Sequence, residues 1–234
     1  LLTMDGKVAH AWKRPYSSVW DATAAVENPV PDDQTYFRKA HVFPDGDLLA
    51  IYIGVGDTPW GYGMVRLDQE SRVEWKNLDR FHHDFDVAPD GRVFGLTHAF
   101  RKERLEGVEH LKPPFLEDFL TVVSPQGETT EKISLPQAIN RSEFRRLLWR
   151  IPYYSLEDPL HTNSVDFLDR QDARRLSRKV PVAVEGQVLL SFRELAGGTI
   201  ALLDTKTEEI VWALRGSWLS QHDPDILPNG DILL

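Results

Sequence analysis

Apolar and polar residues follow one another along most of this chain in short runs that end at tight turns. The clearest runs are residues 92–97, 119–124, 129–135, 187–192, 199–204 and 209–214. Alternation over four to eight residues is typical of half-buried β-strands, and short continuous apolar runs are typical of strands buried on both faces. The pattern therefore predicts a protein built mainly of short β-strands.

One turn signature recurs between pairs of these strands. Apolar runs flank Pro44–Asp45–Gly46, Pro89–Asp90–Gly91 and Pro228–Asn229–Gly230, and Gly186 marks a weaker copy. Proline presets φ, Asp or Asn tolerates a left-handed conformation, and glycine supplies a positive φ, so each signature predicts a hairpin turn. Successive glycines of the set lie 45, 95 and 44 residues apart, which indicates an internal repeat of about 45 residues with one longer interval.

A repeat of about 45 residues with several short strands is typical of a β-propeller, in which each blade is a four-stranded antiparallel sheet. One blade is predicted over residues 83–135 and the next over 161–214. We therefore predict an all-β propeller with about four blades represented, roughly three of them whole. Both ends of the chain lie in strand-like segments, so we expect residues 1–234 to be a single propeller domain that is truncated at both ends.

Three segments interrupt the repeat. Residues 136–151 carry apolar side chains at helical spacing and predict one inserted helix, which either packs on the propeller or binds a partner. Residues 101–114 and 169–181 are charged and rich in turn-forming residues, and we expect both to be solvated loops.

Composition excludes several classes of protein. The chain is 41% apolar and 27% charged, as in a globular protein, and it has no apolar run long enough to cross a bilayer. The net charge of −9 argues against nucleic-acid binding. Cysteine is absent, which removes disulfides, thiolate nucleophiles and cysteine-ligated zinc.

Histidines recur where the blades begin. Four of the eight histidines start or lie on the first strand of a blade, namely His41, His83, His161 and His222. The first strand of a propeller blade is the innermost, so we expect these four imidazoles to converge on the central channel. Imidazole can act as a nucleophile, an acid, a base or a metal ligand near neutral pH. A histidine at the start of a blade can also be a purely structural hydrogen-bonding group.

Two more polar residues accompany His161. Asn163 follows it by two positions, so on a regular strand both side chains face the same way. Arg193 ends the second strand of the same blade. Imidazoles, an amide and a guanidinium together would form a cationic, donor-rich pocket suited to a tetrahedral oxyanion.

These motifs resemble those of a known family. His161–Thr162–Asn163, Ser191–Phe192–Arg193 and Gln221–His222–Asp223, in this order, are similar to the bacterial arylsulfotransferases that do not use a nucleotide sulfate donor. The upstream His82–His83–Asp84–Phe85 and the strand around Trp212 fit as well, and the similarity covers about residue 35 to the end. The resemblance implies a propeller of six blades with its active site in the central channel.

The resemblance also implies roles for individual residues. A sulfuryl group would pass from a phenolic sulfate ester to His222 and then to an acceptor phenol. Arg193 and Asn163 would bind the sulfuryl oxygens, while His83 and His161 would bind sulfate or carry the phenol proton. His41 is added to the substrate-binding set from its position alone. No metal or other cofactor is implied.

Two alternatives remain open at this point. The chain could be a non-catalytic propeller that serves as a scaffold or subunit, or a metal-binding propeller with the histidines as ligands. A protein partner or an oligomer could form through the insertions. Members of the family are commonly exported, so a periplasmic or extracellular location is expected, although no signal is visible in the sequence.

Overall fold

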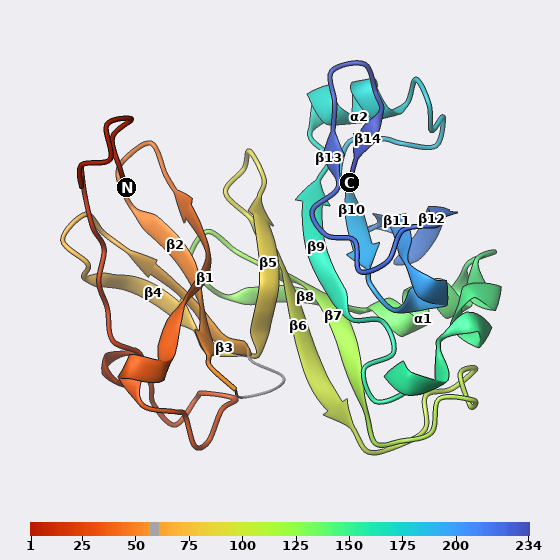
Figure 1. The fold of residues 1–234 in the computed structure, drawn as a ribbon, viewed down its shortest axis with the longest axis horizontal. Helices are drawn as coiled ribbons and strands as arrows, with labels where there is room; N and C mark the ends of the chain where they lie inside the picture. Colours follow the sequence, from red (N-terminus) through yellow and green to blue (C-terminus); the bar gives the residue numbers. More distant parts are fainter. Residues whose placement is uncertain (57–60) are drawn as a thin grey trace. The chain divides into compact units, whose positions relative to one another are not determined.

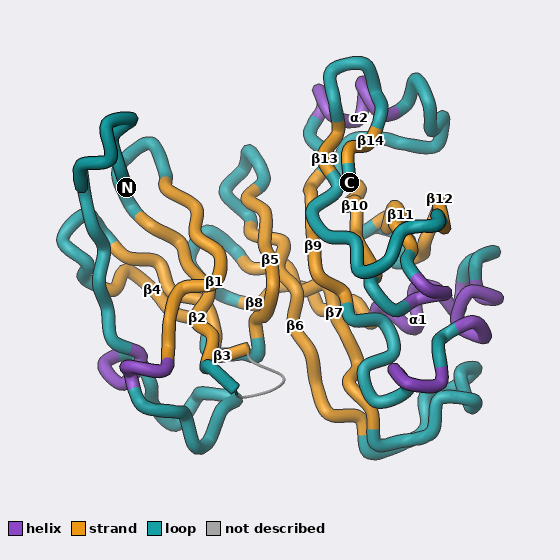
Figure 2. Tube along the Cα trace, viewed as in Figure 1, coloured by secondary structure: helices purple, strands orange, loops and turns teal. Residues whose placement is uncertain are grey.

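The structure is a computed structural model that describes residues 1–56 and 61–234, and the chain forms two compact units, residues 1–82 and 83–234 (Figure 1). Within the described residues there are three four-stranded sheets and one two-stranded sheet. Figure 2 shows that strands dominate both units and that the helices lie outside the sheets. The fold is thus all-β with propeller-type blades, as predicted. That residues 1–234 form a single propeller domain stays a prediction.

Each four-stranded sheet is an antiparallel meander in which sequential strands are neighbours. The first contains β1 (Thr35–Val42), β2 (Leu48–Gly54), β3 (Gly61–Leu67) and β4 (Val73–Asn77). The second contains β5 (Phe81–Val87), β6 (Val93–Arg101), β7 (Phe115–Val123) and β8 (Thr129–Ser134). The third contains β9 (Thr162–Phe167), β10 (Gln187–Phe192), β11 (Thr199–Asp204) and β12 (Glu209–Arg215), and β13 (Asp225–Ile226) pairs with β14 (Ile232–Leu233).

The predicted turns between first and second strands have the expected geometry. Gly46, Gly91 and Gly230 have φ of 90°, 83° and 86°, and Gly186 has φ of 92°. In the first three turns the glycine N–H donates to the carbonyl three residues earlier at 2.9 Å. These turns join the first and second strands of each sheet, and they explain why the repeat is visible in the sequence.

The predicted helix over 136–151 is wrong in its length. Helix α1 spans only Leu135–Arg141, and a separate 3-10 segment covers Arg145–Arg150. Ser142, which is buried, ends α1 because its Oγ donates to the carbonyl of Ile139 and accepts from the N–H of Phe144. This local bonding replaces the next helical turn.

The two expected loops also differ from the prediction. Residues 169–181 contain helix α2 (Arg170–Leu176), whose N-cap Asp169 accepts hydrogen bonds from two backbone N–H groups. Its apolar side chains at helical spacing join a buried cluster on the third sheet. Within 101–114, three apolar side chains are buried in the core of the second unit, namely those of Leu105, Val108 and Leu111. Burial of sparse apolar residues thus outweighs the charged composition of both segments.

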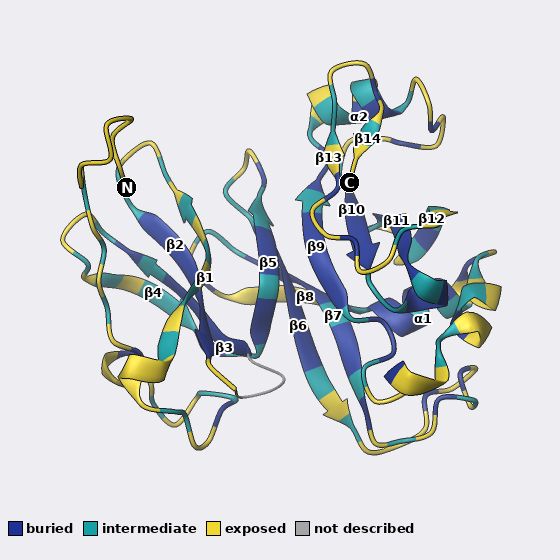
Figure 3. Cartoon of the chain, viewed as in Figure 1, coloured by how far each residue is buried: buried dark blue, intermediate teal, exposed yellow. Residues whose placement is uncertain are grey.

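The cores follow the sheets. One apolar cluster of the second unit fills the space among β6, β7, β10 and α1, and it includes the stacked rings of Phe94 and Phe167, 4.7 Å apart. A separate cluster in the first unit surrounds Tyr16, Tyr52 and Tyr62. Figure 3 shows that the middle strands of the sheets, such as β2, β7 and β10, are the most buried. The remaining 3-10 turns are Tyr16–Ser18, Asp32–Gln34, Tyr153–Ser155 and Leu195–Gly197.

Candidate functional site

Two of the predicted histidines lie against each other in the second unit. The rings of His83, in β5, and His161, just before β9, are 5.1 Å apart between centroids and meet edge to face at 68°. Both residues have a positive φ, 54° and 47°. A left-handed backbone is uncommon for residues other than glycine and clusters at functional sites. Two blades therefore present imidazoles to one place by a similar unusual backbone turn.

Asp158 holds the ring of His161. Its Oδ2 lies 2.5 Å from Nδ1 of His161, so the carboxylate accepts from Nδ1–H and leaves Nε2 pointing away from it. Burial by itself lowers the pKa of His161, but the hydrogen bond and charge of Asp158 outweigh burial and leave that pKa raised above its ordinary value. His161 is accordingly biased toward the imidazolium form.

Asp118 supports the backbone behind this pair. One oxygen of its buried carboxylate accepts from Thr162 N at 2.8 Å and from Thr162 Oγ1 at 2.6 Å. Burial and the nearby charge of Asp158 raise the pKa of Asp118. Neither Asp158 nor Asp118 was predicted from the sequence, because nothing in the repeat distinguishes them from surface aspartates.

Arg193 lies beside His161 through the backbone. Its N–H donates to the His161 carbonyl at 3.2 Å, and the next N–H, of Glu194, donates to the carbonyl of Leu160. The Arg193 side chain is 38% exposed, and its Nε forms an ion pair with Glu194 Oε1 at 3.3 Å without making a hydrogen bond to it. The guanidinium therefore keeps donors that an anion could use.

Asn163 reaches the segment that carries His222. In the pairing of β9 with β10, Ser191 lies opposite Ser164 and Phe192 lies opposite Thr162, which leaves Asn163 as the extra residue of a bulge. The alternation used to predict that Asn163 faces the same way as His161 does not hold across this bulge. Its Nδ2 donates to the Gln221 carbonyl at 2.8 Å.

Gln221 is fixed to the third sheet at both its backbone and its side chain. Its carbonyl also accepts from Ser191 Oγ at 3.4 Å, and its Nε2 donates to the carbonyls of Phe192 and Thr199. The residue is buried. These bonds place the backbone of His222, the next residue, at the end of the third blade near Asn163.

His222 is exposed and has a defined tautomer in its neutral form. Its Nδ1 lies 2.8 Å from the carbonyl of Ser220. A carbonyl can only accept, so Nδ1 carries the hydrogen and Nε2 keeps the lone pair. The nitrogen available for attack on an electrophile is therefore Nε2.

The structure brings together only part of the predicted set. His83, His161 and Arg193 are linked by the contacts described above, and Asn163 binds Gln221, the residue before His222. His41 lies in β1 of the first unit, where its ring contacts Phe43 at 4.8 Å between centroids, so its place in the site stays a prediction. That the ring of His222 approaches the other imidazoles also stays a prediction.

Carboxylates of β5 bind the free edge of β9 in the second unit. Asp84 Oδ2 accepts from Val165 N at 3.0 Å, and Asp86 Oδ2 accepts from Phe167 N at 2.9 Å. Burial and the surrounding carboxylates, Asp86 first among them, raise the pKa of Asp166 to about 7. The innermost strands of two successive blades are thus joined by side chains, which satisfies edge N–H groups that have no strand partner.

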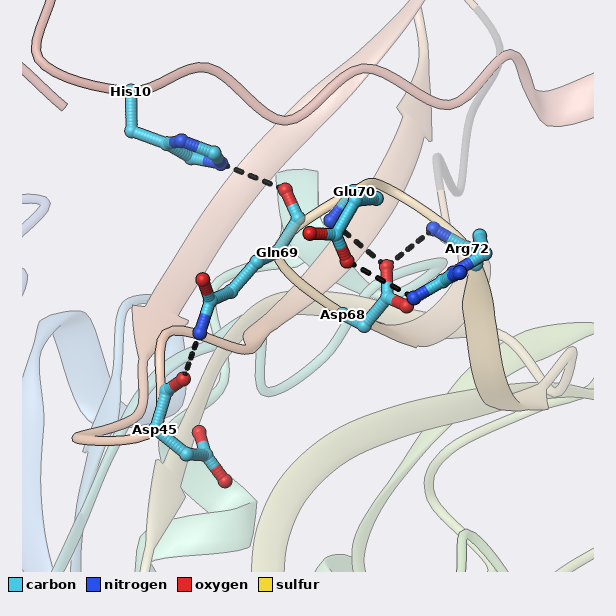
Figure 4. A network of polar contacts seen from close by, with 6 residues as sticks. All are labelled: His10, Asp45, Asp68, Gln69, Glu70 and Arg72. Atoms are coloured by element: carbon cyan, nitrogen blue, oxygen red, sulfur yellow. Dashed lines mark hydrogen bonds and ion pairs between the residues drawn. The ribbon is translucent and has the colours of Figure 1, made fainter.

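His10 lies outside the candidate site and has a local structural partner. His10 Nε2 lies 2.9 Å from the carbonyl of Gln69. The side chain of Gln69 in turn donates to the carbonyl of Asp45, and Figure 4 shows both contacts. In the same network Asp68 binds Arg72 through its backbone and guanidinium in the β3–β4 turn. His10 therefore serves to attach the N-terminal segment to a turn of the first sheet.

The described residues contain neither a cluster of metal-ligating side chains nor a helix of membrane-spanning length and character. Across residues 1–56 and 61–234, no group of three or more histidine, aspartate or glutamate side chains is placed to hold a metal ion. In the same residues, no helix has the length and apolar character needed to cross a membrane.

Comparison with known proteins gives distant structural matches and one family match. The Dos1 propeller is 11% identical with a TM-score of 0.42, covering 80% of this chain and 37% of that one. A luciferin-regenerating enzyme is 9% identical with a TM-score of 0.47, covering 84% of this chain and 52% of that one. The chain thus spans about a third to a half of the length of these two proteins, and no curated protein matches it. The model of the arylsulfotransferase (ASST) family matches residues 39–232, which include every blade strand but the ends of the first and last, and the chain therefore belongs to this family.

Proposed function

We propose that this protein transfers a sulfuryl group from a phenolic sulfate ester to an acceptor phenol through a sulfated His222. The observation that carries the proposal is the close placement of His83 of one blade and His161 and Arg193 of the next, with Asn163 binding the residue before His222. This is a small set of donors and imidazoles of the kind that the family's chemistry requires.

The first step needs a neutral nucleophile and stabilisation of negative charge. Nε2 of His222 has the lone pair, because Nδ1 donates to Ser220. Attack on sulfur forms the N–S bond while the S–O bond to the aryl group breaks and its electron pair leaves with the phenolate oxygen. Sulfuryl transfer resembles phosphoryl transfer, in which catalysis is mostly positioning and electrostatic stabilisation. The guanidinium of Arg193 is suited to bind the equatorial oxygens.

The second step regenerates the enzyme. An acceptor phenol loses its proton to an imidazole and attacks sulfur, the N–S bond breaks, and the electron pair returns to His222. A covalent intermediate between two half-reactions predicts ping-pong kinetics. The reaction needs no redox change, because sulfur stays at the same oxidation level throughout.

The scaffold alternative makes a different prediction from the same structure. A non-catalytic propeller would keep the Asp118, Asp158 and Gln221 bonds for stability but would not gain a sulfuryl group. An exposed imidazole such as His222, for which the described part of the chain shows one hydrogen bond, to Ser220, adds little to such a scaffold. That exposure favours the transferase over the scaffold.

The test uses the full-length purified protein with p-nitrophenyl sulfate as donor and phenol as acceptor. We expect release of nitrophenol that rises with phenol concentration in a ping-pong pattern, and a covalent adduct of one sulfuryl group by intact mass when phenol is omitted. His222→Ala should abolish both the turnover and the adduct. His10→Ala removes an imidazole from the first sheet and is the matched control, which should keep both.

Two results would decide against the proposal. Folded protein that neither releases nitrophenol nor gains an adduct would favour the scaffold. An adduct that survives in His222→Ala and maps to another histidine would retain the activity but refute the nucleophile.

A further inference from the structure

We infer that Asp158 is a positioning residue that holds His161 as the proton donor to the departing phenolate, an inference that rests on the proposed function. The acid–base role belongs to His161, which would touch the substrate. Asp158 would act only through the imidazole.

The geometry of the pair is that of an oriented imidazole. Asp158 Oδ2 and His161 Nδ1 are 2.5 Å apart, with the His161 side chain 12% exposed and that of Asp158 30% exposed. Because the carboxylate takes Nδ1–H, the second nitrogen, Nε2, is directed away from Asp158. Partial exclusion of water strengthens the attraction between an imidazolium and a carboxylate.

The backbone around the pair is fixed on three sides. Arg193 N donates to the carbonyl of His161, Glu194 N donates to the carbonyl of Leu160, and Asp118 accepts two hydrogen bonds from Thr162. These bonds hold His161 at its φ of 47°. A catalytic group is more effective when its own surroundings set its orientation in advance.

The charged and titratable groups that face His161 are Asp158, Arg193, Asp118 and His83. Burial and the Arg193 guanidinium disfavour the imidazolium, whereas Asp158 and, to a smaller extent, Asp118 favour it. The balance leaves the pKa of His161 raised. Loss of the Asp158 charge would therefore leave the pKa of His161 below its ordinary value instead of above it.

The proton balance of the first half-reaction follows. As the S–O bond breaks, the phenolate oxygen takes the proton from Nε2 of His161, which becomes neutral and keeps its Nδ1–H on Asp158. In the second half-reaction the acceptor phenol returns a proton to Nε2. The proton is thus carried between two phenols, and no other acid is consumed.

The test compares leaving groups in the full-length protein. An unactivated phenol has a pKa of about 10 and needs a proton donor, whereas a dinitrophenolate leaves without one. We expect Asp158→Asn to lower the rate of the first half-reaction on phenyl sulfate by about 100-fold, and on 2,4-dinitrophenyl sulfate by no more than a few fold. Glu157→Gln makes the same chemical change on the neighbouring exposed residue and should alter neither rate.

A pH profile gives a second reading that a structural role would not move. On phenyl sulfate, the alkaline limb of the rate should shift to lower pH in Asp158→Asn and return toward its original position in Asp158→Glu. His161→Gln should show the same selective loss on phenyl sulfate, and adding Asp158→Asn to it should cause no further loss.

Failure of this inference can be told apart from failure of the proposed function. Equal losses on both donors, or additive losses in the double variant, would overturn the role of Asp158 while the transferase stands. If the parent protein turns over neither donor, the proposed function fails. The pairing of Asp158 with His161 is then tested by NMR titration of His161. Its pKa should fall in Asp158→Asn, and an unchanged pKa would overturn the pairing itself. If Asp158→Asn does not fold, Asp158→Glu and His161→Gln carry the leaving-group comparison.

Discussion

The side-chain amide of Asn163 donates a hydrogen bond to the backbone carbonyl of Gln221 over 2.8 Å. This bond joins the bulge in the first strand of one blade to the residue that precedes the proposed nucleophile, His222. Asn163 is the extra residue of this bulge, so the alternation of side chains along a regular strand does not apply to it. The position of His222 therefore depends on a contact between residues 58 positions apart.

Asn163→Asp should weaken catalysis through this contact. A carboxylate cannot donate to the Gln221 carbonyl, so two acceptors would face each other in a buried place. We expect formation of the sulfuryl adduct to slow at least tenfold, a loss of about 1.4 kcal/mol, as measured by stopped-flow release of nitrophenol. The control is Asn140→Asp on α1, where the amide donates to the carbonyl of Glu106. This variant should form the adduct at the parent's rate. Equal slowing in both variants would contradict the specific role of Asn163.

Asp118→Ala should destabilise the protein far more than Asp118→Asn. Alanine leaves the N–H and the hydroxyl of Thr162 without acceptors inside the protein, at about 1–3 kcal/mol for each buried group. Asparagine keeps an acceptor oxygen and resembles the protonated acid that the raised pKa of Asp118 favours. Urea unfolding followed by tryptophan fluorescence measures both variants. The explanation fails if the amide is as destabilising as alanine.

Asp166→Asn should stabilise the protein at alkaline pH. The pKa of Asp166 in the folded protein, about 7, lies above its ordinary value of 3.8, so the fold binds the proton more tightly than the unfolded chain does. The stability that this proton supplies is complete below pH 3.8 and is lost as pH rises through 7. Asparagine stays neutral, so its Tm should exceed the parent's at pH 8 and match it at pH 4.

Calorimetry at these two pH values tests the linkage. Asp33→Asn removes the same charge from an exposed position and should show no such pH-dependent gain. A gain of equal size at pH 4 and pH 8 would show that the effect of Asp166 does not come from its ionisation.

Gly230→Ala should cost more stability than Gly186→Ala. Both glycines have a positive φ, which costs an alanine about 1–2 kcal/mol. A Cβ at Gly230 would lie 2.2 Å from the Arg175 carbonyl oxygen of α2, whereas a Cβ at Gly186 would meet nothing within 4 Å. The clash adds about 1–3 kcal/mol at Gly230 alone, which chemical unfolding of the two variants will measure. Equal losses would mean that α2 moves freely away from the turn.

Much of the fold was predictable because its signals are local. The Pro–Asp–Gly turns at Gly46 and Gly91 need only neighbouring residues to adopt their geometry, and strand runs such as 187–192 and 199–204 match β10 and β11 residue for residue. The helical segments were less predictable. Ser142 ends α1 through bonds to its own neighbours. The segment that contains α2 is mostly charged, and only three of its residues, Ala173, Leu176 and Val180, belong to the buried cluster.

The candidate site was predictable only in part, for a physical reason. A histidine at a blade start can be read from the repeat, and so can Asn163 and Arg193 from their motifs. The carboxylates that support these residues cannot be identified from the sequence. Asp118, for example, binds Thr162 from another blade, 44 positions away in the chain. Asp158 lies only three residues before His161, but a loop of irregular backbone has no period from which its orientation follows.

By itself, the sequence determined the blades and their turns, because these depend on φ preferences and on alternation within a few residues, and its motifs supplied the candidate site residues. Only the tertiary structure decided that Nδ1 of His161 binds Asp158, that Nδ1 of His222 binds Ser220, and which carboxyl groups have a raised pKa. Those properties depend on partners and burial, as the bonds to Asp158 and Ser220 and the raised pKa of Asp166 show. Tautomer and charge are set by distances between groups that folding brings together, and no local pattern encodes those distances.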